Sequence, residues 1–263
     1  MEEVRSGREA SDASRWIELA QVDNIRDLGG LPVDGGGVVR RGVLLRASTL
    51  QHATGADVET LVGGLGLRTV LDLRGRREAA REGHGLLEDT TVQRINLPVR
   101  RARSTTADAV PEEYGADLTG FYLAMLEGSG ESLVNAARII GDAERHAVLF
   151  HCAAGKDRTG VLAALLLDAV GVPAEAVVAD YALTGTRVAR IRSRLTRLPS
   201  YRTLPAVEHG FMAAGPEVMD RFLNVLRAGH GGAARWLLHE GLTEAELECL
   251  RDALVEPAPT ARP

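Results

Sequence analysis

The sequence has few of the residues that build disulfide scaffolds, metal clusters or membrane spans. Its 263 residues include only two cysteines, Cys152 and Cys249, and no Cys/His group has the spacing of a zinc site. No apolar run approaches the roughly 20 residues of a membrane-spanning helix, and the first residues lack the basic start and apolar core of a secretory signal. We therefore expect no metal or other cofactor, no transmembrane segment and a cytoplasmic location, with secretion without a signal peptide left open.

Lysine is nearly absent as well. The chain contains 31 basic residues and only one of them, Lys156, is a lysine. The formal net charge of −5 argues against a surface that binds nucleic acid as a whole, so we expect no nucleic-acid partner. An arginine bias with a single exception directs attention to the segment around Lys156.

Length and composition fit one folded domain. With 45% hydrophobic residues the chain can bury a sizeable core. Residues 1–14 are polar and the stretch from Glu256 is rich in proline, so we expect a flexible N-terminus over 1–14, a domain over 15–255 and a flexible tail over 256–263.

Hydrophobic patterning predicts an α/β fold with strands early and helices late. Strands are expected on both sides of the turn at residues 35–37 and then over 69–73, 91–98 and 147–150. Helices are expected over 54–66, 121–126, 131–144, 158–171, 215–229 and 242–255. In the last helix, Thr243 and Glu246 form a capping box, and Cys249 is expected to be a partly buried structural thiol.

The stretch HCAAGKDRTG, residues 151–160, lies between an expected strand and an expected helix. Successive backbone N–H groups in such a loop form a nest for an anion, and the helix dipole adds positive potential. This position favours a cysteine thiolate at Cys152, and the planar guanidinium of Arg158 can hold two phosphoryl oxygens. The residues between them, together with Thr159, are expected to line the phosphate site: Ala153, Ala154, Gly155 and Lys156.

The loop resembles the phosphate loop HCxxGxxR[ST]G of the cysteine-dependent phosphatases. It is most similar to the bacterial tyrosine and lipid phosphatases typified by mycobacterial protein tyrosine phosphatase B, whose loop reads HCxAGKDRTG. Five further stretches agree with that group: NIRDLGG, RRGVLLRAS, VLDLRGRRE, DYALT and GLTEAELECLRDALV. The resemblance covers roughly residues 20–255 and implies a tyrosine phosphatase-like fold, a mostly parallel sheet flanked by helices, with a helical lid over about 183–214.

The resemblance also implies a chemistry. Cys152 would attack phosphorus to give a phosphocysteine, which water would then hydrolyse. The substrate would be phosphotyrosine, with phosphoserine, phosphothreonine and phosphoinositides left open, so that the partner is a phosphorylated protein or a phospholipid. The alternative is a phosphate-binding module without turnover. The sequence does not predict the oligomeric state.

Two aspartates compete for the role of general acid. The resemblance assigns the role to Asp157 inside the loop, because the Trp-Pro-Asp loop of eukaryotic tyrosine phosphatases is absent from this sequence. The alternative is Asp72 at the end of a strand, where α/β enzymes place active groups. Asp72 can equally be a structural partner of Arg74, and both Asp72 and Arg74 are also expected to line the substrate site. His151 is expected to support the loop backbone, and Lys156 to place a mobile charge at its rim.

A basic stripe follows the loop. Arg187, Arg190, Arg194 and Arg197 recur at helical spacing beside an apolar stripe, which predicts an amphipathic helix. In one interpretation the helix packs on the core with a solvated basic edge. In the other it is a lid that recruits acidic substrates or contacts anionic lipid peripherally.

Overall fold

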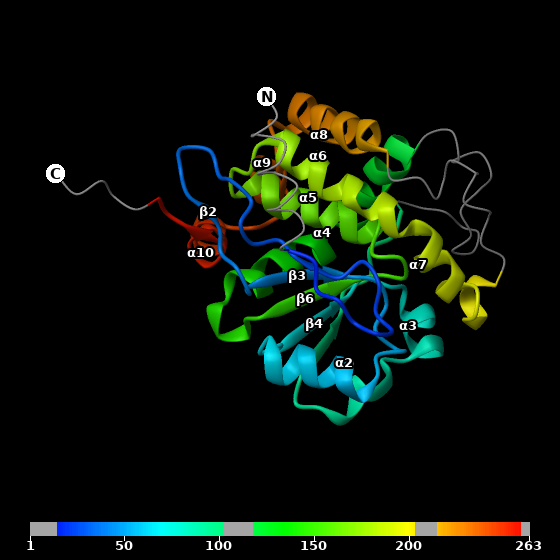
Figure 1. Cartoon of the computed structure of the whole chain (residues 1–263). Helices are drawn as coiled ribbons and strands as arrows, with labels where there is room; N and C mark the ends of the chain where they lie inside the picture. Colours follow the sequence, from blue (N-terminus) through cyan, green and yellow to red (C-terminus); the bar gives the residue numbers. More distant parts are fainter. Residues whose placement is uncertain (1–14, 102–117, 203–214, 259–263) are drawn as a thin grey trace, which may run out of the picture.

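A five-stranded sheet forms the centre of the molecule (Figure 1). The computed structural model describes residues 15–101, 118–202 and 215–258. The strands run in the order β1 (Arg26–Asp27), β3 (Leu44–Ala47), β6 (Val148–His151), β4 (Thr69–Asp72) and β5 (Gln93–Asn96). Only β1 is antiparallel to its neighbour. The expected mostly parallel α/β sheet is confirmed.

Helices cover both faces of this sheet, as parallel strands require. On one side lie α4 (Leu118–Gly141), α5 (Asp157–Ala169), α6 (Ala174–Leu183), α8 (Pro216–His230), α9 (Ala233–His239) and α10 (Glu244–Leu254). The other side carries α2 (Gly55–Glu59) and the π-helical turn Thr60–Gly64. Near the carboxyl ends of β4 and β6 lie α3 (Arg76–Glu82) and α7 (Val188–Leu195). Short 3-10 turns span Gly85–Asp89, Ala143–Arg145, Thr184–Arg187 and Pro199–Tyr201.

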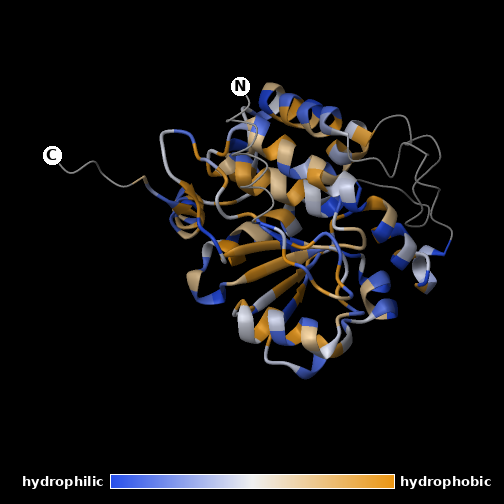
Figure 2. Ribbon diagram, in the orientation of Figure 1, coloured by the Kyte–Doolittle hydropathy of each residue, from blue (hydrophilic) through white to orange (hydrophobic). Residues whose placement is uncertain are grey.

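The sheet has a hydrophobic core on each of its faces, because successive side chains along a strand point to opposite faces. Leu45, Leu149 and Val70 lie side by side in register and pack with the α2 side. Phe150 and its neighbours in register face the helical layer instead. In Figure 2 the central strands and α5 are mainly hydrophobic, whereas α8 alternates between hydrophobic and hydrophilic residues.

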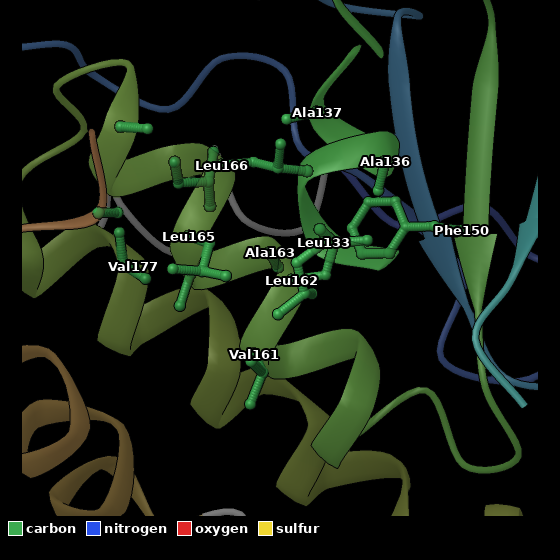
Figure 3. Packing of buried hydrophobic residues seen from close by; sticks show 14 of the residues in the cluster. Leu133, Ala136, Ala137, Phe150, Val161, Leu162, Ala163, Leu165, Leu166 and Val177 are labelled. Atoms are coloured by element: carbon green, nitrogen blue, oxygen red, sulfur yellow. The ribbon is translucent and has the colours of Figure 1, made fainter. Parts of the chain in front are cut away.

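Helix α5 is the buried axis of the helical layer, so its start is rigidly placed. Its residues 161–167 are all at most 2% exposed. Figure 3 shows side chains of this helix packed against Leu133, Ala136 and Ala137 of α4, Phe150 of β6 and Val177 of α6. Because the phosphate loop connects β6 to α5, both of its ends are anchored in the core.

The turn at residues 35–37 was expected to form a hairpin. The structure has the turn, with a single antiparallel bridge between Pro32 and Val38, but β2 (Val38–Val39) pairs as a strand with β7 (Val255–Glu256). The expected tail is therefore wrong at Glu256, which is fixed by pairing with Val38. Residues 1–14 and 259–263 lie outside the described residues.

The stretches expected as separate helices over 121–126 and 131–144 form the two parts of α4, which meet at the non-helical residue Ser129. One prediction about a helical residue needs correction. Cys249 was expected to be partly buried and is exposed. It lies two residues after Leu247, which turns it by about 200° to the opposite face of α10. The capping box of Thr243 and Glu246 is confirmed.

Among the residues that the structure describes, no helix combines the length and the apolar character needed to cross a membrane.

Candidate active site

The loop between β6 and α5 is shaped by a glycine. Gly155 has φ +67°, and a Cβ there would lie 2.4 Å from the carbonyl oxygen of Ala47 on β3. Both the left-handed backbone and the close approach require glycine. Cys152, at the beginning of the loop, is 2% exposed.

Side chains and backbone outside the loop hold its carbonyl groups. The amide of Thr49 donates to the carbonyl of Ala153 at 2.9 Å. The Asn24 side-chain amide donates to the next two carbonyls at 3.2 and 2.8 Å, and Arg46 Nη2 donates to the second of them at 2.9 Å. In a trans peptide the N–H points away from the C=O. The following N–H groups are therefore directed to the other side of the loop, where they can form an anion nest.

Asn24 is itself held in an unusual conformation. Its φ of 56° lies in the left-handed region that Asn tolerates better than most residues. Arg26 Nη1 donates to its Oδ1 at 2.6 Å, which turns the amide nitrogen toward the loop. The NIRDLGG stretch thus supports the loop from β1.

Behind this contact lies a buried ionic cluster. Asp180 of α6 accepts from Arg15 at 2.8 Å, Arg26 at 3.0 Å and Arg46 at 2.8 Å, and every partner is at most 1% exposed. Burial alone would raise the pKa of Asp180, but the three arginines lower it far below its usual range. Burial and the charge of Arg46 lower the pKa of Arg26 to about 10. The cluster fixes β1, β3 and α6 together behind the loop.

Arg158 is positioned by Glu78 of α3. Its Nη1 donates to Oε2 at 2.7 Å and its Nη2 to Oε1 at 3.0 Å. Burial would lower the pKa of Arg158, but the charges of Glu78 and Cys152 raise it well above its usual value. Glu78 occupies the edge formed by the two terminal nitrogens. The guanidinium has a second edge, Nε–H with Nη2–H, that can take two oxygens of an anion.

Lys156 and Asp157 form a pair at the beginning of α5. Lys156 Nζ lies 2.7 Å from Asp157 Oδ1. Lys156 was expected at the rim of the loop, but it is 1% exposed. Its side chain is buried because the charge of Asp157 balances the charge of its ammonium group. Burial would lower the pKa of Lys156, and Asp157 raises it overall.

A tyrosine adds a second donor to Asp157. Tyr122 of α4 donates its hydroxyl to Asp157 Oδ1 at 2.7 Å, and its oxygen lies 2.7 Å from the hydroxyl of Tyr181. Burial, followed by the charge of Asp157, raises the pKa of Tyr122 well above its usual value. Asp157 keeps 15% of its side chain exposed. Thr159, two residues later in α5, is fully buried.

Asp72 and Arg74 form a closed pair. Arg74 donates to both carboxylate oxygens of Asp72 through its Nε and Nη2, at 2.8 to 3.1 Å, and through its backbone N–H at 2.9 Å. Both residues are fully buried. Burial would raise the pKa of Asp72, but His151 and Arg74 lower it overall. Of the two interpretations of Asp72, the geometry favours the structural partner of Arg74.

His151 contacts the loop backbone as expected. Its Nδ1 lies 3.0 Å from the carbonyl oxygen of Cys152, so the ring donates from this nitrogen. Burial lowers the pKa of His151 to about 4, which leaves the ring neutral near pH 7. Its Nε2 faces Asp72 at 3.9 Å and has no hydrogen-bond partner among the described residues.

Asp72, His84 and His151 bring three metal-binding atoms within 4.8 Å of one another. Their positions in the sequence do not predict that these three residues meet. Arg74 already donates to both oxygens of Asp72, so a metal ion would share its carboxylate with a guanidinium. The donor set is a poor fit for a cation.

The helix predicted from the basic stripe lies over the phosphate loop. Ile191, Leu195 and Leu198 are buried against Ala153, with Ala154 at the edge of the same cluster. This confirms the apolar stripe of an amphipathic helix. Residues 203–214 of the expected lid lie outside the described residues.

The arginines of the stripe contact the body of the protein. Arg190 and Arg194 pair with the carboxylate of Asp23, the latter at 3.0 Å. Arg187 pairs with Glu18 and stacks on Trp16, 4.6 Å from the ring centre. Arg197 is exposed. The stripe is therefore largely engaged in ion pairs, and the expected solvated edge is limited to part of it.

The supporting residues that had not been predicted include Asn24, Glu78, Tyr122 and Asp180. Asn24, Glu78 and Asp180 lie in the motifs NIRDLGG, VLDLRGRRE and DYALT, respectively. The sequence analysis thus identified these motifs but assigned no role to the three residues. Tyr122 lies in α4 and carries no sequence signal that links it to the loop.

The fold and the loop define an α/β protein in which a turn between a central strand and a buried helix has the geometry of an anion nest. The model of the tyrosine phosphatase family matches residues 17–256, and the chain belongs to that family. It is therefore a tyrosine phosphatase-like phosphoric monoester hydrolase.

Two curated relatives agree with the family, and one solved structure is a distant match. A Cupriavidus necator protein whose name assigns it to the tyrosine-protein phosphatases is 32% identical over 233 residues, covering 82% of this chain and 80% of its own. The triple specificity protein phosphatase PtpB of Mycobacterium tuberculosis is 27% identical, covering 90% and 98%. The core catalytic domain of the S. cerevisiae PP-IP phosphatase SIW14, solved with citrate, is 16% identical over 66% and 82% of the two chains, with a TM-score of only 0.34.

Proposed function

We propose that the chain hydrolyses phosphotyrosine in proteins through a phosphocysteine at Cys152. The observation that carries this proposal is the arrangement of the loop. Its carbonyl groups are bound from outside by Thr49, Asn24 and Arg46, which directs N–H groups toward an anion above Cys152. Arg158, held by Glu78, supplies the charged edge of the same site.

In the first step the thiolate of Cys152 forms a bond to phosphorus as the phosphorus–oxygen ester bond breaks. Asp157 gives a proton to the departing oxygen. Arg158 and the loop N–H groups stabilise the charge on the equatorial oxygens. In the second step Asp157 takes a proton from water, the water oxygen bonds to phosphorus and the sulfur–phosphorus bond breaks, which releases inorganic phosphate and the thiolate.

Asp157 is preferred over Asp72 as the acid. Asp157 lies at the beginning of α5 with part of its side chain exposed, and Lys156 and Tyr122 fix one of its oxygens. Asp72 is fully buried and Arg74 takes both of its oxygens. Only the first arrangement leaves a carboxyl oxygen within reach of a leaving group.

We further propose that the segment over residues 183–214 is a lid, of which residues up to 202 are described. Its helix α7 packs on Ala153 of the loop, the residue that follows the buried Cys152. A bulky phosphorylated side chain then reaches Cys152 only when α7 moves. The name of the mycobacterial relative, a triple specificity protein phosphatase, supports testing phosphoserine and phosphothreonine beside phosphotyrosine. Phosphoinositides are the further candidates.

The test compares the two cysteines. Cys152→Ser should abolish release of phosphate from a phosphotyrosine peptide, whereas Cys249→Ser, which changes the exposed cysteine, should retain it. Rapid acid quench followed by mass spectrometry should place a phosphoryl group on the peptide that contains Cys152. Activity that survives in Cys152→Ser overturns the proposal, and phosphate binding without turnover in the wild type identifies the binding-module alternative.

Substrate class needs a separate comparison. A panel of phosphotyrosine, phosphoserine and phosphothreonine peptides and phosphoinositide vesicles at matched concentration measures kcat/KM for each. We expect phosphotyrosine to be the best substrate. A preference for phosphoinositides by more than tenfold would overturn that ranking without affecting the role of Cys152.

A further inference from the structure

One contact of the lid reaches Arg158 through a single carboxylate. Tyr201, in the turn Pro199–Tyr201, donates its hydroxyl to Oε1 of Glu78. The same oxygen accepts from Arg158 Nη2 at 3.0 Å. The other oxygen accepts from Arg158 Nη1 at 2.7 Å and from the backbone of Gly75 at 3.1 Å. Glu78 thus joins the lid, the beginning of α3 and the phosphate loop.

The protonation states make this an ionic junction. Burial would raise the pKa of Glu78, but Arg158 and Tyr201 lower it overall. Burial, followed by the charge of Glu78, raises the pKa of Tyr201 above its usual range. Tyr201 therefore stays protonated and donates to a carboxylate, which is a charge-assisted hydrogen bond.

Other described residues of the lid also contact carboxylates of the body. The amide of Ser200 donates to Glu82 Oε1 at 2.9 Å, one helical turn beyond Glu78 on α3. Nearer the beginning of the segment, Arg190 and Arg194 bind Asp23. Carboxylates of the body thus hold the described part of the lid at two places. Among these contacts, the one at Glu78 shares its carboxylate with the phosphate loop.

We propose that Tyr201 is a positioning residue that couples closure of the lid to the orientation of Arg158 through Glu78. The inference rests on the proposed function, since it assigns Arg158 to the substrate phosphate. When the lid lifts, Glu78 loses the donor on Oε1 and its carboxylate can rotate with Arg158. When the lid closes, Tyr201 fixes that carboxylate and Arg158 presents its Nε edge to the phosphate. By linkage, phosphate bound to the loop favours the closed lid.

The experiment is a double-mutant cycle read by binding of inorganic phosphate to the full chain carrying Cys152→Ser. Tyr201→Phe removes the hydroxyl alone, and Glu78→Gln removes the charge that it contacts. We expect Tyr201→Phe to weaken phosphate binding about tenfold, near the lower end of the cost of one lost hydrogen bond to a charged group. In the Glu78→Gln background the same change should have almost no effect, because the two residues act as a unit.

A matched control loosens the lid elsewhere. Arg187→Gln removes the pair with Glu18, which does not contact Glu78. Any effect of Arg187→Gln on phosphate binding should be the same factor in both backgrounds. If Tyr201→Phe weakens phosphate binding by the same factor with Glu78 as with Glu78→Gln, the proposed coupling through Glu78 is wrong and Tyr201 acts only on the lid.

Turnover separates this inference from the proposed function. A chain that binds phosphate with the expected non-additivity but never hydrolyses a phosphate ester retains the coupling and loses the function. Active chains with an additive cycle retain the function and lose the coupling.

A second readout covers failure of Glu78→Gln to fold. The chain has two tryptophans, and Trp16 stacks under Arg187 of the lid. With Trp236→Phe, Trp16 emission reports on lid movement. Phosphate should change that emission when Tyr201 is present and change it at least fivefold less, at equal phosphate concentration, in Tyr201→Phe. Equal changes in both overturn the coupling.

Discussion

The side-chain amide of Asn24 lies 2.8 Å from the carbonyl oxygen of Gly155, although 131 residues separate them. Asn24 thereby links β1 to the turn that shapes the anion nest. Its neighbour Asp23 holds the lid through Arg194 at 3.0 Å. Of these two consecutive residues, Asn24 thus holds the phosphate loop and Asp23 holds the lid.

Replacing Asn24 tests whether loop geometry depends on this contact. Asn24→Gly keeps the left-handed backbone accessible and removes both hydrogen bonds, so it should lower kcat/KM for an aryl phosphate about tenfold. Asn24→Asp, which places an acceptor against the same carbonyls, should be more harmful. Unchanged kinetics in Asn24→Gly would show that Arg46 and Thr49 alone suffice to hold the loop.

A methyl group at Gly155 should disrupt the site. Gly155→Ala places a Cβ 2.4 Å from the carbonyl oxygen of Ala47 in a left-handed backbone of φ +67°. Gly42→Ala is the matched control, since its φ is +72° and nothing lies within 4 Å of the added atom. Both variants carry the conformational cost of about 1 kcal/mol. Only Gly155→Ala should also lose more than 90% of turnover, and equal effects would contradict the role of close packing.

The role of Asp157 depends on the leaving group. Asp157→Asn should lower kcat at least a hundredfold for alkyl phosphates, whose leaving oxygen needs a proton, and much less for nitrophenyl phosphate. Alkylation of Cys152 by iodoacetamide should persist and serves as the control for an intact loop. Similar losses for both kinds of ester would argue against Asp157 as the acid.

The buried cluster around Asp180 should matter for stability. Asp180→Asn leaves Arg15, Arg26 and Arg46 without their shared anion and should lower the free energy of unfolding by roughly 3–5 kcal/mol in urea denaturation. Glu248→Gln removes an exposed pair with Arg251 and should cost less than about 1 kcal/mol. A small effect of Asp180→Asn would mean that the cluster relaxes or admits water.

His151 predicts a specific pH dependence of stability. Burial lowers its pKa from 6.5 to about 4 in the folded chain. As pH falls from 6.5 toward 4, the unfolded chain takes up a proton at this residue and the folded chain does not. Folding should therefore lose up to about 1.4 kcal/mol per pH unit within that window. His151→Gln should flatten the slope, and an unchanged slope would assign it to other groups. Asp180 does not contribute to this slope, because its pKa is lowered in the folded chain. The stability that this carboxylate provides is lost only when the pH falls below its ordinary pKa of 3.8, where the unfolded chain takes up the proton first.

The sequence predicted what local chemistry determines. The loop from Cys152 to Arg158 follows from residue types at fixed spacing between a buried strand and a helix, and the strand β4 ending at Asp72 follows from an apolar run. The amphipathic character of α7 follows from its two stripes. Each of these features depends on neighbours within a few residues of one another.

The missed features depend on tertiary contacts. Nothing local indicates that Glu78 of the short helix α3 reaches Arg158, or that Tyr122 reaches Asp157. The burial of Lys156 was missed for the same reason, since a lysine is expected at the surface unless a partner balances it inside. The Asp72–Arg74 pair was anticipated only as one of two alternatives, because chain proximity does not decide whether a carboxylate faces a cleft.

The small sheet of β2 and β7 joins Val38 to Glu256, which lie far apart in the sequence. During synthesis β2 leaves the ribosome early, and its partner strand emerges only after the helices of the main core. Nascent chains therefore carry β2 without its partner while the residues between the two strands are synthesised. This pairing gives the fold a late-closing long-range contact, which is of the kind that slows folding.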